Sequence, residues 1–381
     1  MNVDQISKIL FPLLRLFPKK RVVLFNSFFG QYNDNPKYVS EVLRKKYPSI
    51  KQVWVVKKSI NKFLPKEFDT VRYASLKYYY YLANSVATVD NMMGSRGTFT
   101  DSKGNLLRKI FIGNKQYNIS TWHGTPLKNI GNDVPGANKN TTYITSAVYL
   151  TSGCEYFSRC IKSSYPGVVL KECGTPRNDI LVNGVDSVDQ MKIKLNIPPE
   201  KHVVLFAPTF RDDIQQSGIA QMQHLDIKRL LNELKKKFGG EWVFVYRVHH
   251  IVEEKLTDLS FDNNVINGNY GEDMAEYLSI SDVLITDYSS SMFDYALTKK
   301  PCFLFALDRE YYESVERGFY VSINDLPFEF SGNNEELINC IIDFDEYSYK
   351  LKIEEFLLSI GNKENGTASE YVADSIASIL K

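Results

Sequence analysis

The stretch that decides the fold prediction, residues 203–210, reads VVLFAPTF. Its five apolar residues followed by a proline are typical of a short strand that is buried on both faces and ends in a loop. A continuous apolar run favours a strand of a parallel sheet, because helices cover both faces of such a sheet. An amphipathic pattern over residues 225–238 follows, so the stretch predicts the start of a strand-helix repeat.

The alternation of strands and helices extends from this stretch in both directions. On its C-terminal side we expect strands at 242–247, 283–286 and 302–305, and helices at 272–280 and 291–297. On its N-terminal side we expect strands at 22–25, 53–56, 86–90 and 118–122, a helix from about residue 36 and another at 76–83. The pattern predicts two doubly wound α/β domains with parallel sheets, which bind ligands at the carboxyl ends of their strands in a central cleft.

The length of 381 residues allows two or three domains of roughly 150 residues each. A helical piece at 184–199 ends in Pro198-Pro199, and we place the domain boundary beside it. The expected parts are an amphipathic helix at 1–21, a first domain at 22–185, a second domain at 186–360, and a C-terminal helix at 361–381 that packs back across the domains.

Composition excludes several classes of protein. Hydrophobic residues make up 44% of the chain and charged residues 24%, as in a folded protein rather than a disordered chain or a multi-span membrane protein. The net charge of +1 provides no chain-wide basic field, so we expect no nucleic-acid partner. Five cysteines without a C-x-x-C pair indicate neither a disulfide framework nor a zinc ribbon, and they favour a reducing compartment.

The first 21 residues differ in charge from the rest of the chain. They hold five basic residues and one acid, or +4, which leaves −3 for the remainder. Apolar residues recur with helical spacing over residues 6–17, and three basic residues follow. This stretch is much shorter than the ~20 apolar residues that span a bilayer. Two interpretations stay open: a helix that lies on an anionic membrane, and a helix with a kink at Pro12 that packs on its own domain.

Histidines that follow the expected strands are candidates for chemistry. His123 lies in the stretch STWHGTP, where Gly124 permits a tight turn and the close approach of a ligand. Arg247 and His249 lie two residues apart, and strand alternation puts this cation and this imidazole on one side, which suits a phosphate. For His123 the alternative is a hydrogen-bonded histidine with no catalytic role. Neither a G-x-G-x-x-G fingerprint nor a Walker A loop occurs, which argues against a dinucleotide oxidoreductase and a P-loop kinase.

Two further loops at the expected strand ends favour the binding of an anion. Asp287 precedes Ser289 and Ser290, one of which we expect to cap the following helix, and a helix N-terminus with nearby hydroxyl groups suits a diphosphate. Thr209 and Arg211 repeat this arrangement after residues 203–207. Arginine beside the acids favours anions, and no carboxylate cluster or histidine pair has ligand spacing, so we expect no metal and no cofactor.

Six segments, taken in order, resemble successive motifs of the CDP-glycerol glycerophosphotransferase family, which includes teichoic acid primases and polymerases and related capsule enzymes. The segments are FGQYNDNPKY (29–38), WHGTPLK (122–128), GTPRND (174–179), APTFR (207–211), RVH (247–249) and ITDYSS (285–290). Lys300-Pro301 and the segment 308–320 extend the resemblance over nearly the whole chain. Each motif is weak alone, and the ordered set is specific.

The resemblance implies a GT-B fold and a membrane-associated enzyme that transfers an alditol phosphate from a CDP-alditol to a lipid-linked acceptor, with release of CMP. By position, His123 matches the proposed general base for the acceptor hydroxyl, and His249 matches the histidine beside the donor pyrophosphate. Ser289 and Ser290 match the diphosphate-binding pair. The other candidates are Thr209, Arg211 and Arg247 for the diphosphate, and Asp34, Asn35, Gly124, Thr125, Lys128, Arg177 and Asp287 for the cleft.

The resemblance also implies the partners. They are a CDP-glycerol or CDP-ribitol donor, a lipid-linked saccharide or polymer acceptor, and an anionic membrane surface at the cytoplasmic face of a bacterial plasma membrane. An acceptor anchored in a membrane favours the interfacial interpretation of residues 1–21. Two other functions stay open: a GT-B glycosyltransferase that uses a nucleotide sugar, and a membrane-bound scaffold without activity, against which the intact set of histidines and serines speaks.

Overall fold

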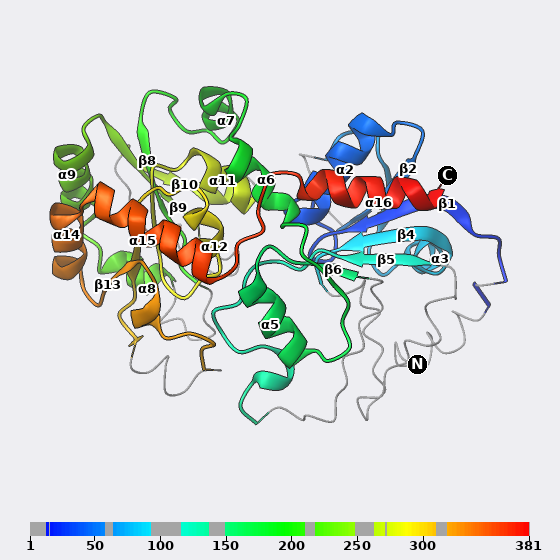
Figure 1. Cartoon of the computed structure of the whole chain (residues 1–381). Coiled ribbons are helices and arrows are strands. Elements are labelled where there is room, and N and C mark those ends of the chain that lie inside the picture. The colour runs from blue at the N-terminus through cyan, green and yellow to red at the C-terminus, as the bar shows by residue number, and fades with distance from the viewer. Residues whose placement is uncertain are drawn as a thin grey trace. The chain divides into compact units, whose positions relative to one another are not determined.

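The computed structural model describes residues 13–14, 16–57, 64–92, 116–136, 149–209, 218–247, 263–270, 273–309 and 318–380. The chain divides into two compact units (Figure 1). Unit 1 comprises residues 1–123, 131–179 and 363–381, and unit 2 comprises residues 124–130 and 180–362. Each unit has a parallel sheet of its own, which confirms the prediction of an α/β fold with two parallel sheets.

Unit 1 contains a seven-stranded parallel sheet with the order β3-β2-β1-β4-β5-β6-β7. Its strands are β1 (Lys20–Asn26), β2 (Lys51–Val56), β3 (Asp69–Arg72), β4 (Ser85–Asp90), β5 (Tyr117–Ser120), β6 (Tyr149–Thr151) and β7 (Leu170–Lys171). Because β1 and β4 are neighbours, the strand order reverses between them. Ligands of open α/β sheets bind at such a reversal, outside the carboxyl ends of the strands.

Helices cover both faces of this sheet. The side chains of Val23 and Phe25 pack under α2 (Asp34–Lys46) and α16 (Ala368–Leu380), whereas Val22 and Leu24 pack on the opposite face with α3 (Leu76–Asn84). This alternation along β1 is the two-residue period of a strand buried on both sides. The other helical elements are η1 (Gly131–Asp133), α5 (Glu155–Ser164), η2 (Pro176–Asn178) and α6 (Asp179–Asn183), the last of which leads into unit 2.

The helix α16 lies beside α2 although more than 300 residues separate them (Figure 1). Val372, Ala373 and Ile376 of α16 are buried in the same apolar cluster as Val39 and Leu43 of α2. Two residues at the end of α2 add polar contacts, since the Nζ atom of Lys46 lies 2.6 Å from Glu370 and the Tyr47 hydroxyl donates to Asp374. The end of the described chain is therefore part of the core of unit 1.

Unit 2 contains a six-stranded parallel sheet with the order β10-β9-β8-β11-β12-β13. Its strands are β8 (His202–Phe206), β9 (Trp242–Tyr246), β10 (Val265–Asn267), β11 (Val283–Thr286), β12 (Cys302–Phe305) and β13 (Glu329–Ser331). Its helices are α7 (Val188–Lys194), α8 (Gly218–Gln223), α9 (Ile227–Phe238), η4 (Gly268–Tyr270), α11 (Met274–Ile280), α12 (Ser291–Ala296), η5 (Ile323–Asp325), α14 (Asn334–Asp343) and α15 (Glu346–Ser359). Residues 203–206 of the stretch VVLFAPTF lie in β8. The five residues of this strand are mostly buried, as the apolar run predicts.

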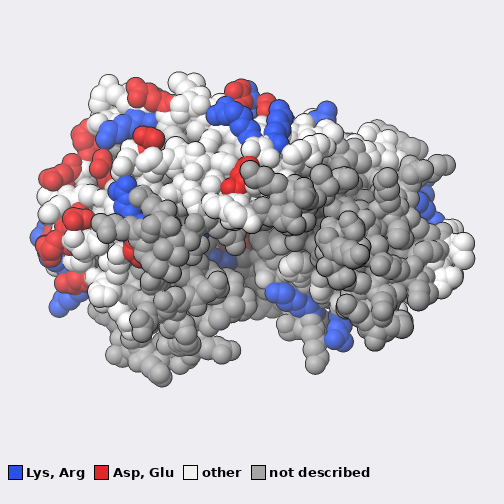
Figure 2. Space-filling view, turned by 90° about the horizontal axis from the view of Figure 1, so that it is seen from below, with Lys and Arg blue, Asp and Glu red and all other residues white. Residues whose placement is uncertain are grey.

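Charged side chains of both signs are interspersed over the part of unit 2 that Figure 2 presents at the left. Several ion pairs of unit 2 are exposed, such as that of Lys299 with Glu354, at 2.5 Å. A pair of this kind contributes about 0–1 kcal/mol to stability, because water screens it and its side chains lose freedom.

Most of the expected helix at 1–21 lies outside the described residues. Within them, Lys20 and Arg21 already belong to β1, and residues 16–19 form a turn and an extended segment. None of the helices in the described part of the chain is long and apolar enough to cross a membrane.

Candidate active site

Residues with left-handed backbone conformation gather in the loop between β1 and α2. Phe28, Phe29 and Asp34 have φ values of 39°, 62° and 55°. Non-glycine residues seldom adopt positive φ, and such residues cluster at functional sites. Gly30 has a φ of 118°, and a Cβ atom there would lie 2.5 Å from the backbone nitrogen of Lys57, so the loop requires glycine at this position.

The strand β5 ends at Ser120, two residues before the expected end at 122. Trp122 has a φ of 53°, a left-handed conformation that a strand cannot contain. The chain therefore turns at Trp122, before His123, and Gly124 directly after the histidine also has a positive φ, of 135°. This turn brings the ring of His123 onto that of Trp122, with 4.5 Å between the ring centroids and 24° between the planes.

The imidazole of His123 is oriented by contacts on several sides. Its Nδ1 atom lies 2.7 Å from the backbone oxygen of Asn91, just after β4. A carbonyl oxygen only accepts hydrogen bonds, so Nδ1 carries the proton and the neutral ring has its lone pair on Nε2. The ring of Phe28 approaches edge-on, at 5.8 Å between centroids. His123 thus has the tautomer that a general base acting through Nε2 requires.

The predicted residues Asp34 and Arg177 form a buried ion pair in unit 1. The Nη1 atom of Arg177 lies 2.8 Å from Oδ2 of Asp34, and the side chains are 9% and 10% exposed. The same Nη1 atom donates to the backbone oxygen of His123, at 3.0 Å. The buried pair therefore holds the backbone oxygen of His123 in place.

Asn35, another predicted residue, connects the start of α2 to the same turn. Its Nδ2 atom donates to the backbone oxygens of Thr121 and Trp122, at 3.1 and 2.8 Å. Its Oδ1 atom accepts from the backbone nitrogen of Arg177, at 2.8 Å. Asp34, Asn35, Arg177 and His123 thus come together in unit 1 from three separate segments, and the first three support the backbone around His123.

Gly124, Thr125 and Lys128 lie in the segment 124–130, which groups with unit 2. Lys128 forms an antiparallel bridge with Phe319. The backbone of this segment pairs with residues 318–320 on both sides of the bridge, at 3.0 and 2.9 Å. Two segments that carry the family resemblance, 122–128 and 308–320, are therefore joined through their backbones.

In unit 2, Asp287 is buried at the carboxyl end of β11. Its Oδ1 atom accepts hydrogen bonds from both the backbone nitrogen and the hydroxyl of Thr209, at 2.7 and 2.6 Å. Both donors of Thr209 are thus used within the protein. Asp287 and Thr209 fasten the loop after β8 to the loop after β11.

The serines that follow Asp287 lie at the start of α12. Ser290 is the N-cap residue by position, but its side chain makes no capping hydrogen bond to the helix. The hydroxyl oxygen of Ser289 accepts from the backbone nitrogen and the hydroxyl of Ser291, at 3.3 and 3.0 Å. The hydroxyl proton of Ser289 can therefore be donated to another group, and both Ser289 and Ser290 are half-buried.

Arg247 follows β9, which ends at Tyr246, one residue earlier than predicted. Its Nη1 atom donates to the backbone oxygen of Gly268, at 2.8 Å, and its guanidinium lies 5.0 Å from the centroid of the Tyr277 ring. These contacts fix the orientation of the side chain. The expected partners Arg211 and His249 lie outside the described residues.

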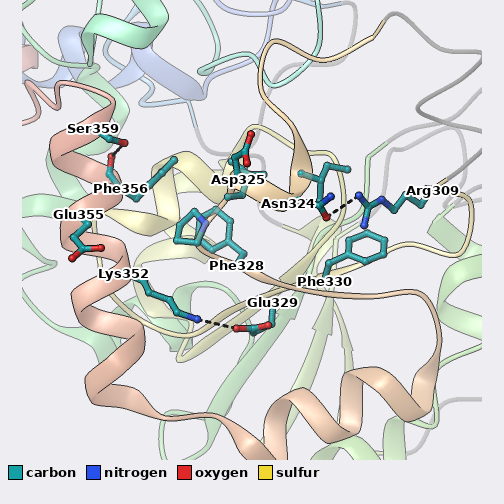
Figure 3. Close-up of a pocket in the computed structure, with 13 residues that line it drawn as sticks. Arg309, Asn324, Asp325, Phe328, Glu329, Phe330, Lys352, Glu355, Phe356 and Ser359 are labelled. Atoms are coloured by element: carbon teal, nitrogen blue, oxygen red, sulfur yellow. Dashed lines mark hydrogen bonds and ion pairs between the residues drawn. The ribbon is translucent and has the colours of Figure 1, made fainter.

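A pocket of about 720 Å³ lies beside β13 and α15 in unit 2 (Figure 3). Its walls contain the ion pair of Glu329 with Lys352, at 3.2 Å, and a hydrogen bond from Arg309 to Asn324, at 2.9 Å. Figure 3 shows Phe328 between these two contacts. None of the predicted site residues lines this pocket, and its walls carry charges of both signs.

Lys300, in the Lys300-Pro301 segment of the resemblance, is partly buried and binds the backbone of unit 2. Its ammonium donates to the backbone oxygen of Ser281, at 2.7 Å. Burial lowers the pKa of this ammonium below its usual value. Within the ranges that the structure describes, no three His, Cys, Asp or Glu side chains gather as a metal site would require.

Sequence reasoning missed Asn91 and Ser27, which contact each other near His123. Neither residue lies in a recognisable motif. Ser27 lies two residues before the segment FGQYNDNPKY, and Asn91 directly follows the strand expected at 86–90. One feature of the sequence could have indicated Asn91: it is a polar residue directly after the strand expected at 86–90. Such positions lie together at the carboxyl edge of a parallel sheet, where ligands bind.

Comparisons with known proteins give matches over nearly the whole chain. The family model described as CDP-Glycerol:Poly(glycerophosphate) glycerophosphotransferase matches residues 9–378. The teichoic acid poly(glycerol phosphate) polymerase of Staphylococcus epidermidis is 33% identical over 386 residues, which are 95% of this chain and 51% of that protein. The teichoic acid glycerol-phosphate transferase of Staphylococcus aureus is 29% identical over 389 residues, 96% of this chain and 95% of that protein.

A similarity in structure accompanies the similarity in sequence. The solved structure of the wall teichoic acid polymerase TagF is 31% identical, with a TM-score of 0.80 over 99% of this chain and 94% of that chain. The chain spans about half the length of the polymerases of Staphylococcus epidermidis and Bacillus subtilis that it matches, 51% in each case.

Proposed function

The chain belongs to the CDP-glycerol:poly(glycerophosphate) glycerophosphotransferase family, and from that premise we propose that it transfers an alditol phosphate from a CDP-alditol to a hydroxyl group of a lipid-linked acceptor. CMP is the second product. The observation that carries the proposal is the orientation of His123, whose Nδ1 proton is held by a backbone oxygen. A neutral imidazole near physiological pH suits the removal of a proton from an alcohol.

The proposed reaction is an in-line displacement at the β-phosphorus of the donor. The acceptor oxygen forms a bond to this phosphorus, and the bond from phosphorus to the oxygen that bridges to the α-phosphate breaks. The electron pair of the broken bond leaves with CMP, and the acceptor proton passes to Nε2 of His123. Positioning and electrostatic stabilisation of the phosphoryl oxygens supply most of the catalysis of such transfers.

Unit 2 is proposed to bind the donor diphosphate. Ser289 and Ser290 provide hydroxyl groups, and Arg247 provides a positive charge held by Gly268 and Tyr277. Arg211 and His249 are proposed to act with them. Thr209 and Asp287 are assigned a supporting role, because both donors of Thr209 are bound to Asp287.

We propose CDP-glycerol as the preferred donor and CDP-ribitol as the alternative donor. The relatives that align with 95% and 96% of this chain carry glycerol phosphate in their names. The test incubates the protein with CDP-glycerol, CDP-ribitol or UDP-sugars and a short lipid-linked acceptor, and it measures the released nucleotide and the product mass. We expect CMP and a mass increase of one or more glycerol phosphates. Release of UDP from a sugar nucleotide would support a glycosyltransferase instead.

His123→Ala tests the base directly. We expect kcat to fall by about 10²–10⁴-fold, the usual contribution of a positioned general base. His202→Ala is the matched control, because His202 lies at the start of β8, at the opposite end of the strand from the carboxyl edge. Turnover of His123→Ala equal to that of His202→Ala would refute the role of His123.

We also propose that the N-terminal region lies on an anionic membrane surface at the cytoplasmic face of the membrane. Leu16 is 81% exposed, and Phe17 contacts Tyr80 of α3 edge-on at 6.0 Å. The Nδ2 atom of Asn84 in α3 donates to the backbone oxygen of Leu14, at 2.9 Å. Phe17 thus contacts α3 while it stays 55% exposed, and both it and Leu16 lie next to the basic residues 19–21, a composition that suits the boundary of acyl chains and headgroups.

Sedimentation with anionic vesicles tests this surface. Leu16→Ser should reduce the binding constant about tenfold, since burying a leucine side chain contributes roughly 1.5–3 kcal/mol. Leu358→Ser is the matched control, because Leu358 in α15 of unit 2 is 80% exposed. Equal binding of the two variants would contradict the proposed membrane surface.

A further inference from the structure

We propose that Asn91 is a positioning residue for His123: its side chain holds in place the backbone oxygen that keeps the proton on Nδ1. The inference rests on the proposed role of His123 as the base. It adds a residue that lies outside every segment of the family resemblance. Asn91 acts through His123 and has no proposed contact with the substrate.

The backbone oxygen of Asn91 needs an anchor because the sheet does not provide one. The last paired residue of β4 is Asp90, which is in register with Asn26 of β1 and Ser120 of β5. Asn91 follows at once, outside the ladder. The direction of its carbonyl therefore depends on what the rest of the residue contacts.

The side chain of Asn91 supplies that anchor, and it is completely buried. Its Oδ1 atom accepts from the backbone nitrogen of Phe28, at 3.1 Å, and its Nδ2 atom donates to the hydroxyl of Ser27, at 3.0 Å. A side-chain amide with one acceptor and one donor engaged in opposite senses has a single orientation. Burial strengthens these bonds, because no water competes for them.

The hydrogen bonds continue from Ser27 into the loop between β1 and α2. The Ser27 hydroxyl donates to Oδ1 of Asn33, at 2.6 Å, and Nδ2 of Asn33 donates to Oε1 of Gln31, at 2.7 Å. Ser27 and Asn33 are buried as well. Each of these contacts pairs a donor with an acceptor, so the loop holds Asn91 in one direction.

The same loop controls the imidazole from a second side. Phe28, whose backbone nitrogen binds Asn91, also places its ring edge-on to His123. The left-handed backbone at Phe28 and Phe29 makes both contacts possible. In an extended chain, the ring of Phe28 would point away from the side chain of Asn91, to which its backbone nitrogen donates. One loop thus directs both the proton and the plane of the His123 ring.

The test reads the tautomer of His123 directly, by nitrogen NMR of the full-length protein with ¹⁵N-labelled histidine. The signal of His123 is assigned by its loss in His123→Ala. In the wild type we expect neutral His123 to be protonated on Nδ1. In Asn91→Ala we expect a mixture of the two tautomers, and in Ser27→Ala a smaller change, because the bond from Phe28 to Asn91 remains.

Kinetics with CDP-glycerol complete the test. Asn91→Ala should lower kcat by about 10- to 100-fold, the usual range for a residue that orients a functional imidazole, and change the KM for CDP-glycerol less than about threefold. Asn118→Ala is the matched control: Asn118 is also a buried asparagine of unit 1 and binds Thr88, away from His123. It should leave both the tautomer and kcat unchanged.

Two results would overturn the inference: a wild-type His123 protonated on Nε2, or an Asn91→Ala variant with the tautomer and kcat of Asn118→Ala. The tautomer is read from the ring itself, so it decides the inference independently of turnover. Full turnover of His123→Ala would count against the proposed function alone.

Discussion

The ion pair of Asp34 with Arg177 illustrates how burial determines the contribution of a single residue. An ion pair of the same length, 2.8 Å, joins Lys51 and Asp69 in the same unit, but there the side chains are 61% and 53% exposed. Removing one partner of a buried pair leaves an uncompensated charge and costs about 3–5 kcal/mol. Removing one partner of an exposed pair costs about 0–1 kcal/mol.

Asp34→Asn should therefore lower the free energy of unfolding by about 3 kcal/mol or more, and Asp69→Asn by less than about 1 kcal/mol. Asparagine tolerates the left-handed backbone of position 34, so the substitution isolates the charge. Urea unfolding of both variants measures the difference. Equal losses of stability would show that Arg177 does not depend on the carboxylate.

Cys173 provides a prediction that depends on pH. Burial of the sulfur, together with the carboxylate of Glu364, raises the pKa of this thiol to about 12. The thiolate is the reactive form, and it becomes tenfold rarer for each pH unit below the pKa. Alkylation of Cys173 by iodoacetamide should thus be very slow at pH 7.5 and rise about tenfold per pH unit up to about pH 11. Mass spectrometry of the alkylated peptide follows the rate, and rapid labelling at pH 7.5 would contradict the expectation.

At this scale, the sequence predicts which residues lie in the candidate site better than which contacts each of them makes. His123, Asp34, Asn35 and Arg177 stand in recognisable segments, and the structure brings them together in unit 1. The contacts of Asn91 depend on the left-handed turn at Phe28 and Phe29. A glycine would indicate such a turn in the sequence, but these two positions hold phenylalanine. Phe28 and Trp122 also have positive φ, which is uncommon for these residue types, so the sequence contains no local signal for either turn.

Among the elements, α16 depends on a cap that comes from a distant part of the chain. The carboxylate of Asp179, at the start of α6, accepts from the backbone nitrogens of Ala368 and Ser369, at 3.0 and 2.7 Å. These nitrogens belong to the first turn of α16, where no intrahelical acceptor exists. Burial raises the pKa of Asp179, although the hydrogen bonds from Ser369 and Ala368 act in the opposite direction.

Asp179→Ala should destabilise unit 1 by about 1–2 kcal/mol, the usual cost of losing a helix cap. Asp179→Asn should cost less, because an amide oxygen still accepts one of the two bonds. Asp189→Ala is the control, since Asp189 is an exposed residue of the first turn of α7 in unit 2. A loss of stability in Asp189→Ala as large as in Asp179→Ala would refute the capping role.

The predictability of elements follows their length and burial. The long helices α9 and α16 and the buried strands β1, β2, β4, β8, β9, β11 and β12 were predicted from apolar runs and periodicity. The strands β3, β6, β7, β10 and β13 were missed. They contain two to four residues, so sheet pairing determines them rather than a local pattern.

At the scale of the whole molecule, the two units should unfold as separable bodies, because each has its own sheet and its own core. Trp54 and Trp122 lie in unit 1 and Trp242 lies in unit 2, and these are the three tryptophans of the chain. In a Trp242→Phe background, tryptophan fluorescence thus reports on unit 1 alone, and calorimetry reports on both units.

A donor analogue and a core variant should act on different transitions. CDP at 100 times its Kd should stabilise unit 2 by about 2.7 kcal/mol. Ile376→Ala in α16 should destabilise unit 1 by about 2–5 kcal/mol, since Ile376 is completely buried. Fluorescence of the Trp242→Phe background should respond to Ile376→Ala and not to CDP. A single transition that shifts with both would contradict the independence of the units.

The position of α16 also has a consequence for biosynthesis. Ribosomes make the strands of the first sheet early, but the helix that completes their apolar cluster comes only after all of unit 2 has been translated. Val23, Phe25 and Trp54 therefore stay partly uncovered while more than 300 further residues are synthesised. We therefore expect the nascent chain to expose an apolar surface of defined composition, to which a holding chaperone can bind until α16 covers it.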